Sequence, residues 1–331
     1  MDQIKISVIM SVYNTKTEYL KEAIDSILNQ TFNQFEFIIV NDGSDYKTQE
    51  TLDEYVDKRI KIITNQTNLG LTQSLNIALE IAQGKYIARM DADDISMPDR
   101  LKKQYNYMEK NKEIGVLGCW TGNNVNNKVQ HWCGNVSSEW RRVEMLFGNC
   151  GIAHPTAMIR KSILDQEQIK YNETIKKSQD YELWTKLLKY TKMAVYPEKL
   201  FIYRLHSGQI TVYASKQQKF YSERIRRRLF DELQIQLSEK QMAQILDLKK
   251  TILNMNELEQ VFQKIEKANE NLKIYDDKIL HYALVNIWVE IVITRIKKKE
   301  FNSLCRQSRN YIITPKYMWW RTKLYIDMHF N

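Results

Sequence analysis

Residues that bend, break or cross-link a chain are scarce in this sequence of 331 residues. Its 4 prolines and 10 glycines are too few for a collagen-like or proline-rich disordered protein. The 4 cysteines form neither a C-x-x-C pair nor a zinc-ligand spacing with histidine. We therefore expect free thiols in a reducing compartment, and neither a disulfide framework nor a structural zinc site.

Long apolar runs are absent as well. The longest, from Tyr282 to Ile293, has about twelve residues and contains Asn286 and Glu290, whereas a membrane-spanning helix requires about 18. The N-terminal run from Ile6 to Met10 has the length of a strand and lacks the features of a signal peptide. The sequence therefore favours a cytoplasmic protein that has no membrane-spanning helix.

Apolar residues nevertheless make up 43% of the chain, enough for one large domain with an appendage. In the first hundred residues, β-rich segments alternate with amphipathic ones. The predicted strands are 4–12, 35–40, 59–64 and 85–90, and the helices between them are 17–31, 46–57 and 68–84. This alternation is typical of βαβ units, and it predicts an α/β fold with a mostly parallel sheet.

Beyond residue 100 the pattern changes. The predicted elements are a helix from Pro98, a strand at 114–120, helices at 137–147 and 177–190, and two short strands within 193–211. From residue 215 the chain is nearly all helical in pattern, with no glycine after Gly208. This shift predicts a domain of residues 1–212 followed by an α-helical region of residues 213–331.

Polar residues directly follow three of the predicted strands. The segments are Val12–Asn14, Asn41–Asp45 and Asp91–Asp94. Ligands of open parallel sheets bind beyond the carboxyl ends of the strands, so we expect the three segments to meet at one edge.

Asp91 and Asp93 in the last of these segments suggest a metal site. Carboxylate oxygens at this spacing suit Mg²⁺ or Mn²⁺ bound to a diphosphate. The alternative is a solvated acidic turn or a helix cap. Asp99 complements the dipole of the helix that follows, and Asp94 is left without a role.

Four segments together resemble the inverting glycosyltransferases of family 2, which have the GT-A fold. They are SVIMSVYN, QTFNQFEFIIVNDGSDYKT, NLGLTQSLNIALEIAQGKYIARMDADDISMPDR and SQDYELWTKLL. The similarity covers roughly residues 5–211. It implies a nucleotide-diphospho-sugar transferase domain with a Rossmann-like, mostly parallel sheet, followed by a C-terminal α-helical region.

The resemblance also implies which residues bind the donor nucleotide. They are Val12, Tyr13, Asn14, Asp42, Arg89, Asp91 and Ala92. Tyr13 would line the base, and Asp42 would accept a hydrogen bond from it, as expected for uracil.

For the metal and the chemistry, the resemblance implies a second set of residues. Asp91 and Asp93 would bind Mn²⁺ or Mg²⁺, with His206 as a further ligand. Asp180 would be the catalytic base that deprotonates the acceptor hydroxyl. Gln179 stands before it, where the family usually has a glutamate.

The implied reaction is a single displacement that inverts the anomeric carbon. The implied donor is a UDP-sugar, either a UDP-hexose or a UDP-N-acetylhexosamine. The acceptor would be a glycan or a lipid-linked saccharide in the synthesis of capsule, exopolysaccharide or lipopolysaccharide.

Two other functions stay open. A nucleotidyltransferase would also bind a metal and a nucleotide, but it would carry a glycine-rich basic loop that SVYNTKTEYL lacks. A catalytically silent scaffold subunit of a glycan assembly complex is the other. The presence of Asp42, Asp91, Asp93 and Asp180 argues against it.

Four further side chains have two interpretations each. Arg89 contacts the diphosphate or pairs with neighbouring acids, and His154 lies near a substrate or shapes the turn before Pro155. Trp184 belongs to the core or stacks on a sugar, and the loop containing Trp132 borders the acceptor or has no such role.

The positive charge of the chain is concentrated near its C-terminus. Residues 291–331 contain nine basic and two acidic residues, interleaved with aromatic ones such as Trp319 and Trp320. This pattern predicts binding to an anionic membrane surface. The alternative is a solvated helical face that packs on its own core; nucleic-acid binding is disfavoured, because no such motif accompanies the charge.

Overall fold

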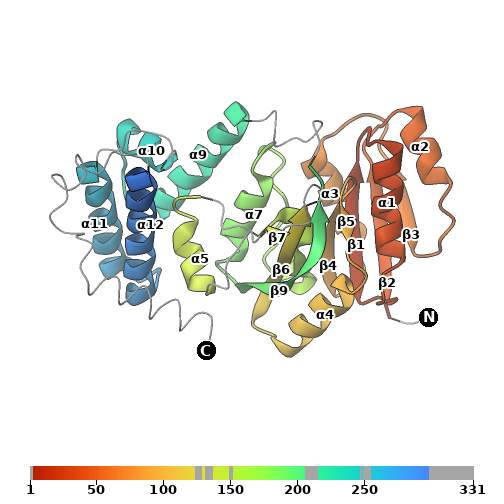
Figure 1. The fold of residues 1–331 in the computed structure, drawn as a ribbon, viewed down its shortest axis with the longest axis horizontal. Helices are drawn as coiled ribbons and strands as arrows, with labels where there is room; N and C mark the ends of the chain where they lie inside the picture. Colours follow the sequence, from red (N-terminus) through yellow and green to blue (C-terminus); the bar gives the residue numbers. More distant parts are fainter. Residues whose placement is uncertain are drawn as a thin grey trace. The chain divides into compact units, whose positions relative to one another are not determined.

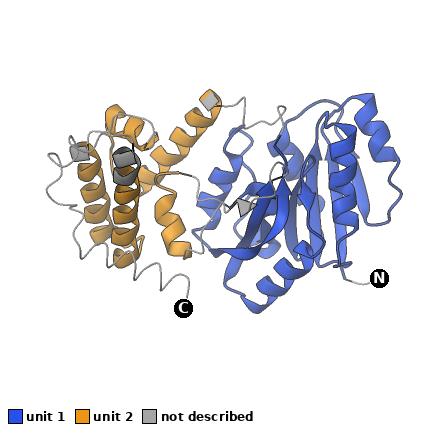
Figure 2. Cartoon of the chain, viewed as in Figure 1, with its two compact units in different colours: residues 1–134, 151–215 blue, residues 135–150, 216–331 orange. Residues whose placement is uncertain are grey.

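The computed structural model describes residues 3–123, 129–130, 137–148, 152–205, 215–246, 248 and 255–297. The chain divides into two compact units (Figure 2). Unit 1 consists of Met1–Gly134 and Gly151–Ser215, and unit 2 of Asn135–Cys150 and Lys216–Asn331. Whether these units are independent domains stays a prediction.

The segment 135–150 does not follow the expected division into residues 1–212 and 213–331. It was expected in the N-terminal domain, but it groups with the C-terminal helices. The reason is side-chain packing: the ring of Phe147 meets Phe262 edge to face at 5.5 Å, and Arg142 lies over the ring of Tyr275. Hydrophobic periodicity along a segment does not reveal such distant partners.

Unit 1 contains a sheet of nine strands in the order β3-β2-β1-β4-β8-β6-β9-β5, with β7 paired to β6 (Figure 1). The strands are β1 (Ile6–Val12), β2 (Phe35–Asn41), β3 (Ile60–Thr64), β4 (Tyr86–Asp91), β5 (Ile95–Ser96), β6 (Ile114–Asn123), β7 (Val129–Gln130), β8 (Met158–Arg160) and β9 (Lys192–Tyr203). The first four strands are parallel, as predicted. Beyond them the sheet is mixed, because β8 runs antiparallel to both β4 and β6.

The helices of unit 1 cover the sheet and position the loops at its carboxyl edge. They are α1 (Thr17–Leu28), α2 (Tyr46–Asp53), α3 (Leu71–Ile81), α4 (Arg100–Lys110), η1 (His154–Thr156), α6 (Lys161–Gln166) and α7 (Gln179–Leu187). Strands β1 and β2 are buried along almost their whole length, as parallel strands covered on both faces are. Both therefore have long apolar runs in the sequence.

Strand β9 corrects the prediction of two short strands. It is one strand of 12 residues that pairs with β6. The register shifts where Cys119 and Trp120 pair with Tyr196 and Lys199, so Pro197 lies in the irregular stretch. Proline has no backbone N–H for a ladder, which explains both the irregularity and the break in the sequence pattern.

The described part of unit 2 is helical, as predicted. Its helices are α5 (Ser138–Glu144), α9 (Ser215–Glu232), α10 (Glu239–Leu246), α11 (Met255–Leu272) and α12 (Asp277–Lys297). Phe230, Phe262 and Trp288 are buried among them. None of the described helices combines the length and the apolar character that crossing a membrane requires. The basic residues 298–331 lie outside the described residues.

Glu36 is a buried acid in the sheet, far along β2 from the carboxyl edge. It accepts hydrogen bonds from the Ser7 hydroxyl (2.6 Å) and the Gln83 N–H (2.7 Å), and Lys61 forms an ion pair with it. Burial by itself works to raise the pKa of Glu36, but the hydrogen bonds outweigh it, and the pKa lies below its ordinary value. The ionised carboxylate therefore stabilises the fold.

Replacing Glu36 with alanine leaves the Ser7 hydroxyl and the Gln83 N–H without their acceptor. We expect a loss of about 1–3 kcal/mol in the free energy of unfolding at pH 7, measured by urea titration. Because the pKa is lowered on folding, this contribution is complete above the ordinary value of 4.5 and disappears as the pH falls below it.

The matched control is Glu54→Gln, which alters an exposed ion pair with Lys21 and should change stability little. A Glu36→Ala defect that stays the same size from pH 7 to pH 3 would contradict the assignment.

Candidate active site

The carboxyl ends of β1, β2 and β4 are level with one another. Ser11 lies opposite Asp91 across one ladder, and Val12 lies opposite Asn41 across the other. The three polar segments therefore meet at one edge of the sheet, as the strand pattern predicted. Figure 1 shows these strands side by side.

The segment after β1 is bonded to the segment after β2. The Asn14 N–H donates to Ser44 Oγ (3.2 Å), and the Asp45 N–H donates to Asn14 Oδ1 (2.8 Å). Tyr13 beside them is 52% exposed, so its ring is accessible to a ligand. The Val12 side chain is fully buried, so a ligand could reach this residue only through its backbone.

Asp42 is almost completely buried and organises the next loop. Its carboxylate accepts hydrogen bonds from the N–H groups of Leu69 and Gly70 and from Asn65 Nδ2, each at 2.8 Å. These bonds hold the loop before α3 against the end of β2. Sequence reasoning assigned Asp42 to the nucleotide base and missed this structural role; its contact with a base stays a prediction.

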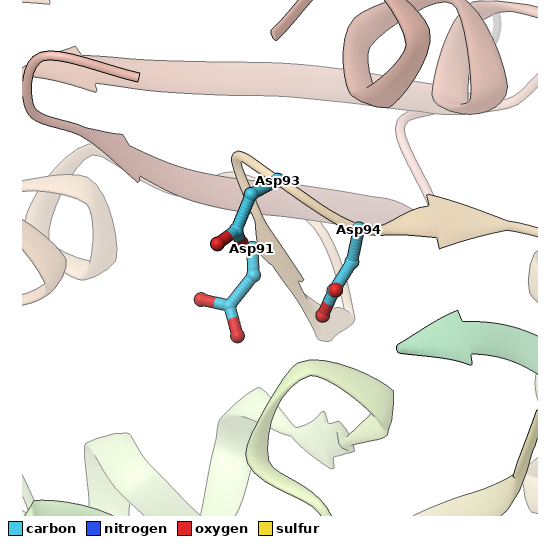
Figure 3. A group of neighbouring side chains, drawn as sticks. All are labelled: Asp91, Asp93 and Asp94. Carbon is cyan, nitrogen blue, oxygen red and sulfur yellow. The ribbon is translucent and has the colours of Figure 1, made fainter. Parts of the chain in front are cut away.

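Asp91, Asp93 and Asp94 form an acidic cluster at the end of β4. One ligand oxygen from each lies within 4.8 Å of the others, and Figure 3 shows the three carboxylates on the same side of the turn. Asp94, left without a role by the sequence, is fully buried and accepts the Arg204 N–H at 2.9 Å. Its Oδ2 atom is buried and has no hydrogen-bond partner among the described residues.

This cluster has the chemistry of a site for a hard divalent cation. All three side chains offer oxygen ligands only, and the buried Oδ2 of Asp94 is an acceptor still to be satisfied. Such oxygen ligands suit Mg²⁺ or Mn²⁺, whereas zinc and copper prefer the nitrogen and sulfur ligands of histidine and cysteine. The residues present therefore fit the metal that the sequence suggested.

The charges at this edge interact strongly. Burial raises the pKa of Asp91, Arg89 opposes this effect, and the charges of Asp93 and Asp180 add to it. Burial also raises the pKa of Asp94 well above its ordinary value, with Asp91 and Asp93 contributing. The charge of Asp180 therefore acts on Asp91, and the role of Asp180 as catalytic base stays a prediction.

Arg89 lies beneath the cluster and is only 2% exposed. Its guanidinium forms an ion pair with Asp91, and its backbone N–H donates to the Ala157 carbonyl. The ion-pair interpretation of Arg89 is therefore confirmed, and a contact with a diphosphate stays a prediction. The Ala92 side chain is buried in the turn, so a ligand there would meet mainly its backbone.

Asp180 lies in the first turn of α7 and is partly buried. The helix begins after Ser178, whose φ of 62° turns the chain sharply. Trp184, one turn further along, is fully buried and belongs to the core. The Asp180 carboxylate is therefore partly exposed to solvent, while Trp184 anchors the same helix in the core.

His154 and Tyr171 are buried together, and His154 contacts Trp184 of α7. His154 Nε2 and the Tyr171 hydroxyl are 2.7 Å apart, and the ring of His154 meets Trp184 edge to face. Burial lowers the pKa of His154 well below its ordinary value, and the nearby charge of Arg89 acts in the same direction. His154 therefore lies buried as a neutral imidazole within the short turn η1, and a place near a substrate stays a prediction.

The comparisons with known proteins agree with this geometry. A model of glycosyl transferase family 2 matches residues 7–167. An uncharacterized glycosyltransferase of Methanocaldococcus jannaschii is 39% identical over 67% of this chain and 78% of its own length. A second, from Haemophilus influenzae, is 36% identical over 67% of this chain and 72% of its own length. This chain belongs to glycosyl transferase family 2. It is a glycosyltransferase.

Solved structures support the same fold for this family 2 enzyme. Staphylococcus aureus TarS 1–349 in complex with UDP-GlcNAc has a TM-score of 0.59 at 20% identity, covering 89% of this chain and 92% of that one. The mannosyltransferase PcManGT of Pyrobaculum calidifontis, in complex with GDP-Man and Mn²⁺, has a TM-score of 0.52 at 13% identity, covering 98% and 85%. The GT-A expectation is confirmed.

Some site residues could not be checked, and others were missed. His206 and the loop with His131 and Trp132 lie outside the described residues. Tyr171 was missed because nothing adjacent in the sequence marks it. Its position on His154 depends on two segments that pack together only in the folded chain.

Two glycines beside Asp42 allow a test of the loop geometry. Gly43 has φ of 67°, and a Cβ there would lie 2.4 Å from the Thr67 carbonyl carbon. Gly70 has φ of 93°, but a Cβ there would meet nothing within 4 Å. The positive φ makes alanine cost about 1–3 kcal/mol in the free energy of unfolding at either position. We expect Gly43→Ala to cost more than Gly70→Ala, because only its Cβ also meets backbone atoms.

Urea unfolding of the two variants measures this difference. Equal losses would mean that the loop moves away from Gly43 without cost, which would contradict the tight packing at this edge.

Proposed function

We propose that this glycosyltransferase transfers a sugar from a UDP-sugar, either a UDP-hexose or a UDP-N-acetylhexosamine, to a hydroxyl of a glycan or lipid-linked acceptor, with inversion. The observation that carries the proposal is the acidic cluster of Asp91, Asp93 and Asp94 at the carboxyl edge of the sheet. Asp180, in the first turn of α7, adds its charge to those that act on Asp91. This arrangement pairs a base for the acceptor with a metal site for the donor. TarS, which has the same fold, has been crystallised in complex with UDP-GlcNAc.

Asp91 and Asp93 would hold Mn²⁺ or Mg²⁺, and Asp94 lies close enough to contribute. When bound, the metal would stabilise the negative charge that develops on the departing diphosphate. His206 is proposed as a further ligand from its sequence position alone. Arg89, paired with Asp91, orients one carboxylate of the cluster and opposes the effect of burial on its pKa.

The other roles fall to the residues around the edge. Tyr13 is exposed and would line the base, and Asp42, whose loop is already ordered, would accept a hydrogen bond from the base. Asp180 would accept the proton of the acceptor hydroxyl as the new bond forms. A direct displacement with one base inverts the anomeric carbon, because no carboxylate first takes the sugar covalently.

Relatives support an acceptor in surface-polysaccharide synthesis. The O-antigen biosynthesis glycosyltransferase WbnJ of Escherichia coli is 37% identical over 55% of this chain and 71% of its own length. WfgD of Escherichia coli is 31% identical over 57% and 72%, and its name specifies UDP-Glc and a GlcNAc-diphosphoundecaprenol acceptor. We infer that a lipid-linked saccharide is the acceptor class for this enzyme.

Turnover of UDP-sugars with Mn²⁺ tests the proposal. We expect release of UDP from at least one UDP-hexose or UDP-N-acetylhexosamine, and loss of this release when the metal is chelated. Asp93→Ala should abolish turnover, and Asp180→Asn should lower kcat by about 10²- to 10⁴-fold while donor binding remains.

Asp99→Asn is the matched control, because Asp99 belongs to the same acidic run but bonds to Thr31. Its turnover should equal that of the unaltered enzyme. Release of pyrophosphate in a separate assay with UTP and a sugar 1-phosphate would favour a nucleotidyltransferase, and inactivity with every donor would favour the scaffold interpretation.

We also propose that the basic residues 291–331 bind an anionic membrane surface, at its cytoplasmic face, where a lipid-linked acceptor would be found. The supporting observation is the excess of nine basic over two acidic residues, interleaved with tryptophan and tyrosine.

Flotation with anionic liposomes tests this surface. Full-length protein should float with the vesicles, and a 1–290 truncation should stay behind. Flotation in neutral liposomes provides the control for charge, and equal recovery of both proteins in the soluble fraction would overturn the proposal.

A further inference from the structure

The side chain of Asn76 in α3 forms two hydrogen bonds with the backbone of Tyr171, an arrangement called the clamp below. Its Oδ1 accepts the Tyr171 N–H (3.0 Å), and its Nδ2 donates to the Tyr171 carbonyl (2.9 Å) and to Glu173 Oε1 (2.9 Å). Asn76 is only 5% exposed. Asparagine is a poor helix former, and these hydrogen bonds compensate the cost of burying it in the middle of α3.

From Tyr171 a series of contacts leads to the helix of the catalytic base. The Tyr171 hydroxyl meets His154 Nε2 at 2.7 Å, and the ring of His154 meets Trp184 at a centroid distance of 6.0 Å. Trp184 and Asp180 are four residues apart on α7, so they share one face of the helix. The clamp on Tyr171 therefore acts on α7 through the contact between His154 and Trp184.

The other end of α3 is fixed to the nucleotide side of the site. Asp42 accepts the N–H groups of Leu69 and Gly70 immediately before the helix begins at Leu71. Thr72, one turn before Asn76, donates to the Ile175 carbonyl. One short, rigid helix thus connects Asp42 to the segment that leads into α7.

We propose that Asn76 is a positioning residue, which fixes Asp180 relative to the nucleotide edge through α3, Tyr171 and His154. This inference rests on the proposed function, in which Asp180 is the base. Asn76 is buried and hydrogen-bonded to Tyr171, so its loss should lower kcat and leave the KM for the donor nearly unchanged. A misplacement of about 1 Å in a catalytic group is enough to lower the rate by about 100-fold.

The chain contains a matched control for this clamp. Asn269 of α11, in unit 2, accepts the Tyr275 N–H (2.8 Å) and donates to the Tyr275 carbonyl (3.0 Å) and to Asp277 Oδ1 (2.8 Å). It is also buried on a helix. Its chemistry is the same as that of Asn76, but it has no connection to α7 through the contacts described above.

The experiment compares Asn76→Ala with Asn269→Ala in the full chain with Mn²⁺ and the active UDP-sugar. We expect both to lower the thermal midpoint, and only Asn76→Ala to lower kcat, by about 10- to 100-fold with an unchanged KM for the donor. Tyr171→Phe, which keeps the backbone clamp and removes only the hydroxyl bond, should lower kcat less. Equal kcat in the Asn76→Ala and Asn269→Ala enzymes would overturn the inference.

Hydrogen exchange of the same proteins separates this inference from the proposed function. Amides of residues 171–187 should exchange faster in Asn76→Ala than in the unaltered chain, and at the ordinary rate in Asn269→Ala. If the unaltered enzyme turned over no UDP-sugar, the proposed function would be wrong. The hydrogen exchange of residues 171–187 would then still test whether Asn76 holds α7 in place. Unchanged exchange at 171–187 in Asn76→Ala, or in Asn76→Asp if the alanine variant does not fold, would overturn the inference.

Discussion

Mutual repulsion among carboxylates at one edge of a buried sheet is the constraint on which the rest of unit 1 depends. Asp91, Asp93 and Asp94 have oxygens within 4.8 Å of one another, where like charges repel strongly in a partly desolvated place. The fold offsets part of this repulsion with Arg89 beneath the cluster and with the backbone N–H of Arg204. Both arginines are nearly buried, so their positions are set by packing as well as by charge.

The compensation extends into the surrounding elements. Arg204 stacks over Tyr19 at 4.8 Å and pairs with Glu22, so the end of β9 is tied to α1 by the residue whose backbone holds Asp94. On the other side of the site, α3 buries polar side chains where an ordinary amphipathic helix would bury apolar ones. A buried polar group is tolerated only when it is hydrogen-bonded, and each of these groups has a partner in a neighbouring segment. On this face of α3, directional hydrogen bonds from the polar side chains take the place of some apolar contacts.

Much of the sheet could be predicted because its signals are local. β1 and β2 are apolar runs of strand length, and the acids directly follow β4 in the sequence. The burial of Asn76 on α3 could not be predicted. An amphipathic pattern places apolar residues such as Leu79 on the buried face of a helix, and asparagine on the exposed one. Only the partner residues in the segment 171–175 explain which face is buried. The allocation of residues 135–150 to unit 2 has the same origin, since it depends on aromatic packing with residues far along the chain.

The sequence by itself determined the family 2 resemblance, the order of the first strands and helices, and the acids at the carboxyl edge, because each is encoded in neighbouring residues. The tertiary structure alone decided that Asp94 is buried, that Asp42 orders a loop, and that Tyr171 and His154 pack together beside Trp184 of α7. The physical reason is that burial and hydrogen-bond partnership are properties of pairs of segments. A pattern read along one segment contains no information about which other segment will supply the partner.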